Sequence, residues 1–199
     1  MIKIQVPATS ANLGSGFDSL GIALKMYNRV MMEEFDGVDI KTSDGSDVPR
    51  DETNLIYTSA KFLYDLCGRP FHGLRLIQEN NIPMTRGLGS SSACIVAGLV
   101  GANTILKNPL SKDDLVNLAA RLEGHPDNST PAILGGLVTS VFDGNRVYSV
   151  KVPISGRLKF AAFIPNFELK TEVARAALPE SVPHKDAVYN LSRAALMTA

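Results

Sequence analysis

Residues 82–93 read Ile82-Pro83-Met84-Thr85-Arg86-Gly87-Leu88-Gly89-Ser90-Ser91-Ser92-Ala93, and they carry the strongest chemical signal in the chain. They lie between a strand predicted at 73–79 and a helix predicted at 90–107. Two glycines one residue apart let the backbone turn sharply and approach a ligand closely. The three serines fall on the first turn of the helix, where unpaired N–H groups and the helix dipole favour an anion. The sequence therefore predicts a phosphate-binding loop, and a glycine-rich turn with a serine N-cap is the alternative.

This loop differs from the two common nucleotide-binding sequences. No Gly-Lys-Ser/Thr follows the glycines, so it is not a Walker A motif, and it is not a dinucleotide fingerprint either. A serine hydroxyl at the start of the helix can reach a magnesium ion as well as a phosphate.

The rest of the chain reads as strands and helices interspersed along the sequence. Strands are predicted at 2–6, 20–35, 38–42, 73–79, 136–142, 146–152 and 158–164. Helices are predicted at 54–67, 90–107 and 111–123, from Thr171, and from about residue 185. Residues 7–18, 80–89 and the stretch between 123 and 136 are predicted loops. This mixture is typical of the α+β class, and 153–156 is the expected domain boundary.

Composition limits the possible functions. Basic and acidic side chains are equal in number, 20 of each, which argues against a nucleic-acid partner. No apolar run reaches the roughly 18 residues of a membrane span, and the first residues read as a strand and not as a signal peptide. Cys67 and Cys94 are far apart in apolar segments, so we expect two reduced thiols in a cytoplasmic protein, with a disulfide or metal site as the alternative.

Three further stretches, taken with the loop, carry a family resemblance. They are Pro-Ala-Thr-Ser-Ala-Asn-Leu-Gly-Ser-Gly-Phe-Asp at 7–18, Glu-Gly-His-Pro-Asp-Asn at 123–128 and Thr-Glu-Val-Ala-Arg-Ala-Ala-Leu-Pro at 171–179. With Pro-x-x-x-Gly-Leu-Gly-Ser-Ser-x-Ala at 83–93, the chain resembles the GHMP kinases, which phosphorylate small alcohols, and among them the homoserine kinases. The resemblance implies a GHMP kinase fold: a ribosomal-protein-S5-like ATP-binding domain over 1–153 and the start of a ferredoxin-like domain over 154–199.

The resemblance also implies a reaction and a set of site residues. The reaction is transfer of the γ-phosphate of ATP to the hydroxyl of L-homoserine, a step toward threonine, with Mg²⁺. Ser91 and Glu123 would hold the metal. The implied catalytic residues are Asn12, Asp127 and Asn128, and the implied substrate-binding residues are Asn12, Asp18, His125 and Arg175. The implied ATP-binding residues are Asn54, Pro83, Met84, Thr85, Arg86, Gly87, Leu88, Gly89, Ser90, Ser91, Ser92, Ala93 and Thr171.

The chemistry of two of these residues suits an amino-acid substrate. The Asp18 carboxylate can hold an ammonium group. The Arg175 guanidinium can pair with a carboxylate through two parallel hydrogen bonds, a geometry that lysine would not supply.

The singled-out residues also have structural interpretations. Asn12 and Asp18 are common in turns, and Asn54 and Asp127 can cap helices. His125 can be a hydrogen-bonded structural histidine, and Arg175 can be a solvated charge on a helix face. For function, the alternatives are a kinase for mevalonate or a sugar, and a kinase-like fold that binds a ligand without turnover.

The family continues beyond the last residue of this chain, so we expect the second domain to be incomplete. The last predicted helix carries apolar residues at helical spacing that need a partner surface, namely Val188, Leu191, Ala194, Ala195 and Leu196. A homodimer is one possible partner arrangement, and no nucleic acid or membrane is expected.

Overall fold

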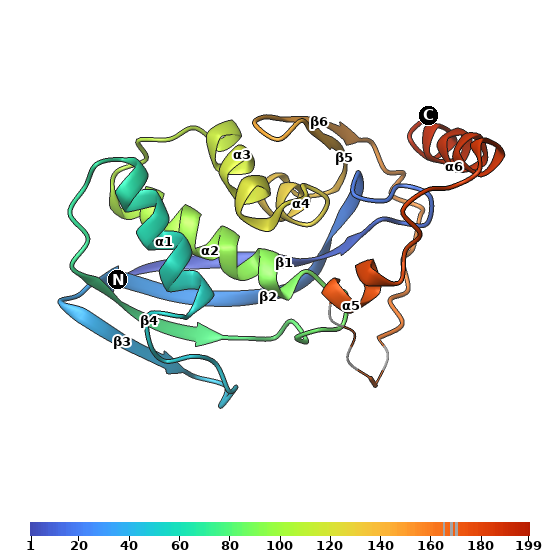
Figure 1. Ribbon diagram of the computed structural model, residues 1–199. Coiled ribbons are helices and arrows are strands. Elements are labelled where there is room, and N and C mark those ends of the chain that lie inside the picture. The colour runs from blue at the N-terminus through green and yellow to red at the C-terminus, as the bar shows by residue number, and fades with distance from the viewer. Residues whose placement is uncertain (165, 168, 170) are drawn as a thin grey trace.

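The computed structural model describes residues 1–164, 166, 167, 169 and 171–199. The strands are β1 (Ile2–Ala11), β2 (Leu20–Glu34), β3 (Gly37–Thr42), β4 (Gly73–Glu79), β5 (Leu137–Phe142) and β6 (Val147–Val152). The helices are α1 (Leu55–Leu66), α2 (Ser90–Ile105), α3 (Lys112–Glu123), α4 (Ser129–Leu134), α5 (Thr171–Ala176) and α6 (His184–Met197). Figure 1 shows one sheet with α1 to α4 on one face and with α5 and α6 beside it.

The sheet is mixed and is built around the long strand β2. Its order is β3-β4-β2-β5-β6, and β1 pairs with the remaining edge of β2. The β3–β4 pair is parallel and the other pairs are antiparallel. The β1–β2 register runs from Ile2 opposite Met32 to Ala11 opposite Gly21, and it shifts between Pro7 and Thr9.

β4 and β5 share one edge of β2 but pair with opposite ends of it. β4 pairs with residues 29–34 of β2, and β5 pairs with residues 20–22. Within the described ladders, residues 23–28 of β2 have no strand partner on this edge. The predicted phosphate loop enters here, because the side-chain oxygen of Asn28 accepts a hydrogen bond from the backbone N–H of Ile82 at 2.8 Å.

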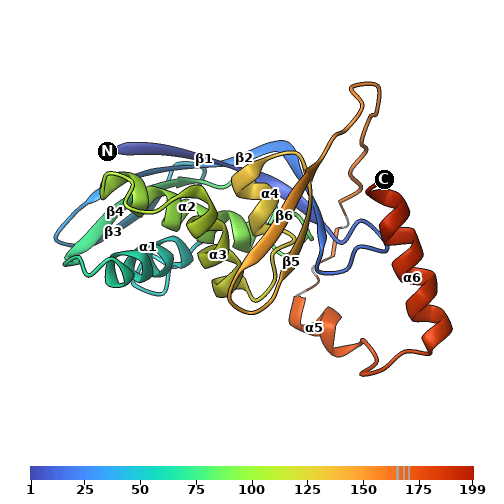
Figure 2. The ribbon, with the colours of Figure 1, turned by 90° about the horizontal axis from the view of Figure 1, so that it is seen from above.

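The core lies between the sheet and the layer formed by α1 to α4, which Figure 2 shows from above. α2 is the central helix, and ten of its sixteen residues are buried, as expected of a helix that is apolar on all sides. Gly98 lets α2 pack closely on α1, since a Cβ there would lie 2.4 Å from the Ile56 carbonyl oxygen. Met32 and Leu76 of the sheet and Leu99 of α2 are fully buried in this core.

The opposite face of the sheet is polar. Arg75 of β4 donates to Glu33 at 2.9 Å and to Asp39 at 2.7 Å. Arg29 donates to Glu79 at 2.7 Å. A largely antiparallel sheet with one packed and one solvated face explains why polar and apolar residues alternate along these strands.

The described residues after β6 lie at the side of this core. α6 has no buried residue, and in Figure 2 both α5 and α6 stand beside the sheet and its helices. The Asn190 side chain of α6 donates to the Ser15 carbonyl at 2.9 Å, which ties α6 to the loop after β1. Among the described residues, no helix combines the length and apolar character needed to cross a membrane.

The structure confirms most predicted elements and corrects three. Residues 7–11, assigned to a loop, extend β1, because β2 is long enough to pair with them. α4 lies in a predicted loop; its Pro131 falls in the first turn, where a missing N–H breaks no helical hydrogen bond. The strand predicted at 158–164 is wrong. These residues form no strand, and Phe163 is 94% exposed, since none of the described strands pairs with this segment.

Candidate active site

The predicted phosphate loop is held to the sheet at both ends. Ile82 is bonded to Asn28 of β2, and the backbone N–H of Thr9 in β1 donates to the Leu88 carbonyl at 3.1 Å. Gly87, between these anchors, and Gly89, directly after Leu88, have φ values of 71° and 66°, in the left-handed region that favours glycine. Gly89 is the N-cap of α2, so the helix begins with its free N–H groups at the loop.

The loop forms one wall of a cavity of about 640 Å³. The other walls come from the loop after β1, from the segment between α3 and α4, and from residues around α5. The predicted site residues that line it are Asn12, Thr85, Arg86, Gly87, Leu88, Gly89, Ser90, Ser91, Ser92, Glu123, His125, Asp127, Asn128, Thr171 and Arg175. Segments more than 160 residues apart in sequence therefore meet at one cavity.

A second hollow, of about 1060 Å³, lies between α3 and the β5–β6 hairpin. Two of its polar side chains, those of Asn117 and Arg121, are engaged in local structure. Asn117 accepts from the Val147 N–H at 2.8 Å, and Arg121 donates to the Asn145 side chain at 3.1 Å. We therefore place the site in the smaller cavity, where the phosphate loop and the carboxylates converge.

Glu123, the last residue of α3, has the chemistry of a metal ligand. Its Oε1 accepts a hydrogen bond from the Ser92 hydroxyl at 2.7 Å. Its Oε2 is buried and has no hydrogen-bond partner among the described residues. Burial raises the pKa of Glu123, the bond from Ser92 opposes this, and the nearby Asp127 carboxylate adds to the rise. A cation beside Oε2 would remove the cost of burying this charge, so the side chain fits Mg²⁺.

Asp127 and His125 form a close pair at the cavity wall. His125 Nδ1 lies 2.6 Å from Asp127 Oδ1, and the Asp127 side chain is 2% exposed. This hydrogen bond raises the pKa of His125, and burial opposes the rise. The N-cap of α4 is Asn128, so the capping alternative for Asp127 does not hold. Gly21 makes room for this segment, since a Cβ there would lie 1.7 Å from the Asp127 carbonyl oxygen.

Asp18 and Arg175 pair with each other. Arg175 donates from two nitrogens to the two Asp18 oxygens, at 2.5 and 3.0 Å, and its guanidinium lies 5.2 Å from the centroid of the Phe17 ring. The Asn12 side chain accepts from the Asp18 N–H at 2.9 Å, and Asn12 and Asp18 both have positive φ. Arg175 is therefore not simply a solvated charge on the surface of α5.

Five predicted residues do not line the cavity: Asp18, Asn54, Pro83, Met84 and Ala93. Asp18 contacts the site indirectly, because it pairs with Arg175, which lines the cavity. Asn54 is 3% exposed; its oxygen accepts from the Ile56 N–H at 3.0 Å and its amide donates to the Pro49 carbonyl at 2.9 Å. Both ends of this side chain are used at the start of α1, which favours the capping interpretation over adenine binding.

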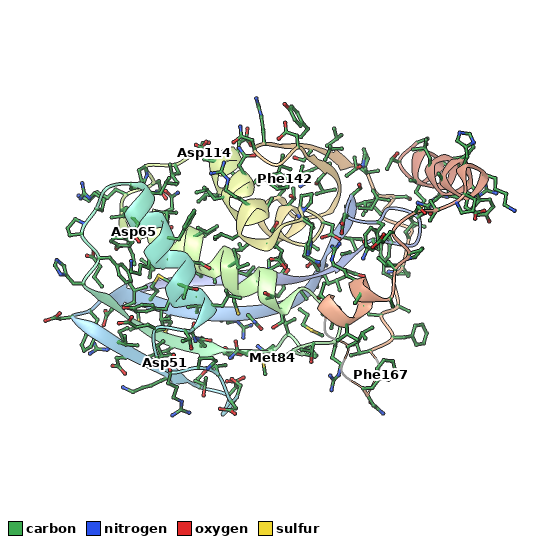
Figure 3. The ribbon with its side chains drawn as sticks, in the orientation of Figure 1. Asp51, Asp65, Met84, Asp114, Phe142 and Phe167 are labelled. Atoms are coloured by element: carbon green, nitrogen blue, oxygen red, sulfur yellow. The ribbon has the colours of Figure 1, made fainter. Side chains whose placement is uncertain are left out.

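Leu169, just before α5, contacts the phosphate loop. The Leu169 N–H donates to the Thr85 carbonyl at 3.1 Å. Figure 3 labels Met84 on the segment that follows β4, and Phe167 beneath α5. Phe167 and Leu169 line the cavity although no motif included them.

Sequence reasoning also missed Thr9, Gly21 and Ser92 in their observed roles. Ser92 was assigned to phosphate binding, but its hydroxyl meets Glu123. The signal for Ser92 is the helical geometry itself: Ser91 is exposed, whereas Ser92, 100° further round the helix, points inward. Thr9 lies within the matched stretch 7–18, but nothing in its residue type marks it as a contact.

Comparison with known proteins identifies the class. Residues 54–136 match the family model of the GHMP kinases N terminal domain. A homoserine kinase from Clostridium beijerinckii is 48% identical over 201 residues, covering 100% of this chain and 67% of that protein. The chain belongs to the GHMP kinase family.

Among its relatives, the chain is similar to homoserine kinases. One from Caldicellulosiruptor saccharolyticus is 49% identical, and the match covers 100% of this chain and 65% of that protein. The crystal structure of a homoserine kinase from Cytophaga hutchinsonii superposes with a TM-score of 0.81 at 29% identity, over 99% of this chain and 66% of the other. The chain thus spans about two thirds of the length of these relatives. The GHMP kinase fold is confirmed, as a single mixed sheet with helices.

Proposed function

We propose that the protein transfers the γ-phosphate of ATP to the hydroxyl of L-homoserine, giving O-phospho-L-homoserine and ADP in threonine biosynthesis. The observation that carries the proposal is the layout of the cavity: the phosphate loop forms one wall, and Asp127 and Arg175, which pairs with Asp18, line the same cavity. Relatives named homoserine kinases at 44–49% identity support the same reaction.

The nucleotide would bind through the loop. Backbone N–H groups from Gly87 to Ser91 and the amino end of α2 suit the phosphates of ATP. Arg86 and Thr171, both at the cavity wall, add polar groups at its rim. Groups of this kind position the phosphates and neutralise their charge, which is most of what phosphoryl transfer requires from a protein.

Mg²⁺ would be held by Glu123 and Ser91. Glu123 offers its unpartnered Oε2, and Ser91 offers an exposed hydroxyl at the cavity wall. When bound, the metal neutralises charge on the phosphates. The Ser92 hydroxyl fixes the other oxygen of Glu123 and so aims the carboxylate.

Binding of the acceptor would open the Asp18–Arg175 ion pair, and each of the two side chains would then pair with one charged group of the acceptor. The ammonium group of homoserine replaces the guanidinium on Asp18, and its carboxylate replaces the carboxylate on Arg175, so neither charge is left alone. The hydroxyl then faces Asn12, Asp127 and Asn128, with His125 holding Asp127 in place. Asp127 accepts the hydrogen bond from the acceptor hydroxyl and orients it toward the phosphate.

The organisation of the protein is part of the same proposal. We place the ATP-binding domain over 1–153 and the start of a second domain over 154–199. Both cysteines are free, which suits the cytoplasm. The exposed apolar residues of α6, such as Leu191 at 70% and Leu196 at 76%, suit contact with further protein surface, which includes a second copy of the chain.

Analogues that lack one charge test the proposal. Kinetic assays use the complete gene product. We compare homoserine with 4-hydroxybutyrate, which lacks the ammonium group, and 3-aminopropan-1-ol, which lacks the carboxylate. Homoserine should be phosphorylated with a kcat/KM at least about tenfold above either analogue, because each analogue leaves a charge unpaired. Equal rates for the three alcohols would refute the assignment of the pair to substrate binding.

A further inference from the structure

Thr9 lies where β1 passes the cavity, just after the register between β1 and β2 shifts. Ile4, Val6 and Ala8 point into the core by the ordinary alternation of a strand. Thr9, the next residue after Ala8, breaks this alternation, because it is also fully buried, at 0% exposure.

The two polar groups of Thr9 contact different parts of the site. Its backbone N–H donates to the Leu88 carbonyl of the phosphate loop at 3.1 Å. Its hydroxyl donates to Asn128 Oδ1 at 2.7 Å. A Cβ on Gly89 would lie 2.0 Å from the Thr9 hydroxyl, so this oxygen packs directly on the backbone where α2 begins.

We propose that Thr9 is a positioning residue that fixes the Asn128 amide relative to the phosphate loop. This inference rests on the proposed function. Because the hydroxyl occupies Asn128 Oδ1, the NH₂ group is turned toward Asp127, whose Oδ1 lies 3.5 Å from it. Thr9 thereby holds the acceptor end and the nucleotide end of the cavity at a fixed distance from each other.

A comparison within the chain distinguishes this role from ordinary core packing. Thr130 is equally buried, at 0% exposure, and its hydroxyl has no hydrogen-bond partner among the described residues. It lies two residues after Asn128 in α4. The same Thr→Val change can therefore be made at two buried sites, only one of which holds Asn128.

The experiment compares Thr9→Val, Thr9→Ser and Thr130→Val in the complete gene product. Thr9→Val should lower kcat by about tenfold to a hundredfold, as expected when a group in the site is misplaced by an ångström or so, with KM for ATP unchanged. Thr9→Ser, which keeps the hydroxyl, should restore kcat, and Thr130→Val should match the unaltered protein. In an Asn128→Ala background, Thr9→Val should have no further effect on kcat.

A second readout does not depend on turnover. The side-chain NH₂ resonances of Asn128, assigned by their loss in Asn128→Asp, should shift in Thr9→Val and stay in place in Thr9→Ser and Thr130→Val. If Thr9→Val does not fold, Thr9→Cys replaces it, because a thiol keeps the size but is a weak donor.

The outcomes test the role of Thr9 separately from the proposed kinase function. Unchanged Asn128 resonances, or an unchanged kcat, in folded Thr9→Val would overturn the role of Thr9. A loss of kcat in Thr9→Ser as large as in Thr9→Val would also overturn it, because the methyl group and not the hydroxyl would then matter. If the unaltered protein phosphorylates no acceptor, the proposed function fails, and the resonances alone decide whether Thr9 orients Asn128.

Discussion

Arg175 of α5 and Asp18 of the loop after β1 are 157 residues apart, yet they meet through two hydrogen bonds of 2.5 and 3.0 Å. Their side chains are 38% and 35% exposed, and Arg175 lines the cavity, so a ligand there can contact Arg175. A bidentate pair of this kind presents one cation and one anion at a fixed spacing, which matches the two charges of an amino acid.

Removing the arginine tests this match. Arg175→Ala leaves the substrate carboxylate without its partner, which costs about 2–5 kcal/mol for a hydrogen-bonded charge pair. At about 1.4 kcal/mol for each factor of ten, kcat/KM for homoserine should fall by at least about 30-fold. KM for ATP should not move, because Arg175 faces the acceptor. Unchanged kinetics with homoserine would remove Arg175 from the substrate site.

A charge exchange provides the control. The double variant Asp18→Arg, Arg175→Asp keeps an ion pair between the loop and α5 but inverts its direction. If the pair only holds the two segments together, this variant should recover both stability and activity. We expect it to recover thermal stability relative to the single variants and to remain inactive.

Glu123→Gln tests the metal site. The change keeps the size of the side chain and removes its charge, so the cation loses a ligand. We expect kcat to fall by at least about a hundredfold, the scale seen when one electrostatic stabiliser of a transition state is lost, with an unchanged circular dichroism spectrum. Glu52→Gln, at an exposed position, is the matched control. A folded Glu123→Gln protein with normal kcat and normal Mg²⁺ dependence would place the metal elsewhere.

Gly21→Ala tests how the Asp127 segment is placed. The added Cβ would lie 1.7 Å from the Asp127 carbonyl oxygen, so that backbone must move. We expect a loss of about 1–3 kcal/mol in the free energy of unfolding, as for other overpacked sites, together with a fall in kcat. Gly156→Ala, where a Cβ meets nothing within 4 Å, should change neither quantity. Normal kcat in Gly21→Ala would show that the position of Asp127 is not critical.

Asn54→Ala separates capping from adenine binding. Loss of an N-cap side chain costs about 0.5–2 kcal/mol of stability, and urea denaturation should show a decrease of this size. KM for ATP should be unaffected, since both ends of the Asn54 amide bond to the protein. A large rise in KM for ATP without a change in stability would reverse this assignment.

The sequence was most informative where local rules determine structure. The helix predicted at 111–123 is found as α3, Lys112–Glu123, and Gly89 at the start of α2 adopts the left-handed conformation that favours glycine. Hydrophobic alternation and helical spacing located the strands of the sheet and α1 to α3. The strand predicted at 158–164 fails because a strand requires a neighbour, which its own residues cannot indicate.

The site was predictable as a set of residues but not as a set of contacts. Motif matching selected Asn12, Glu123 and Asp127 as site residues, and all three line one cavity. It could not show that Ser92 meets Glu123, because this depends on the rotation of α2. It could not single out Thr9 either, because its contacts with Leu88 and Asn128 join segments that are far apart in the sequence.

The acceptor preference of the complete gene product tests the central claim most directly. ATP and Mg²⁺ are mixed with the protein and equal concentrations of homoserine, mevalonate, shikimate and galactose, and the phosphorylated products are resolved by ³¹P NMR. The account predicts O-phosphohomoserine as the main product, because only homoserine offers both charges to Asp18 and Arg175. A faster reaction with mevalonate or galactose would contradict the homoserine assignment, and the absence of every phosphorylated product would contradict the kinase assignment itself.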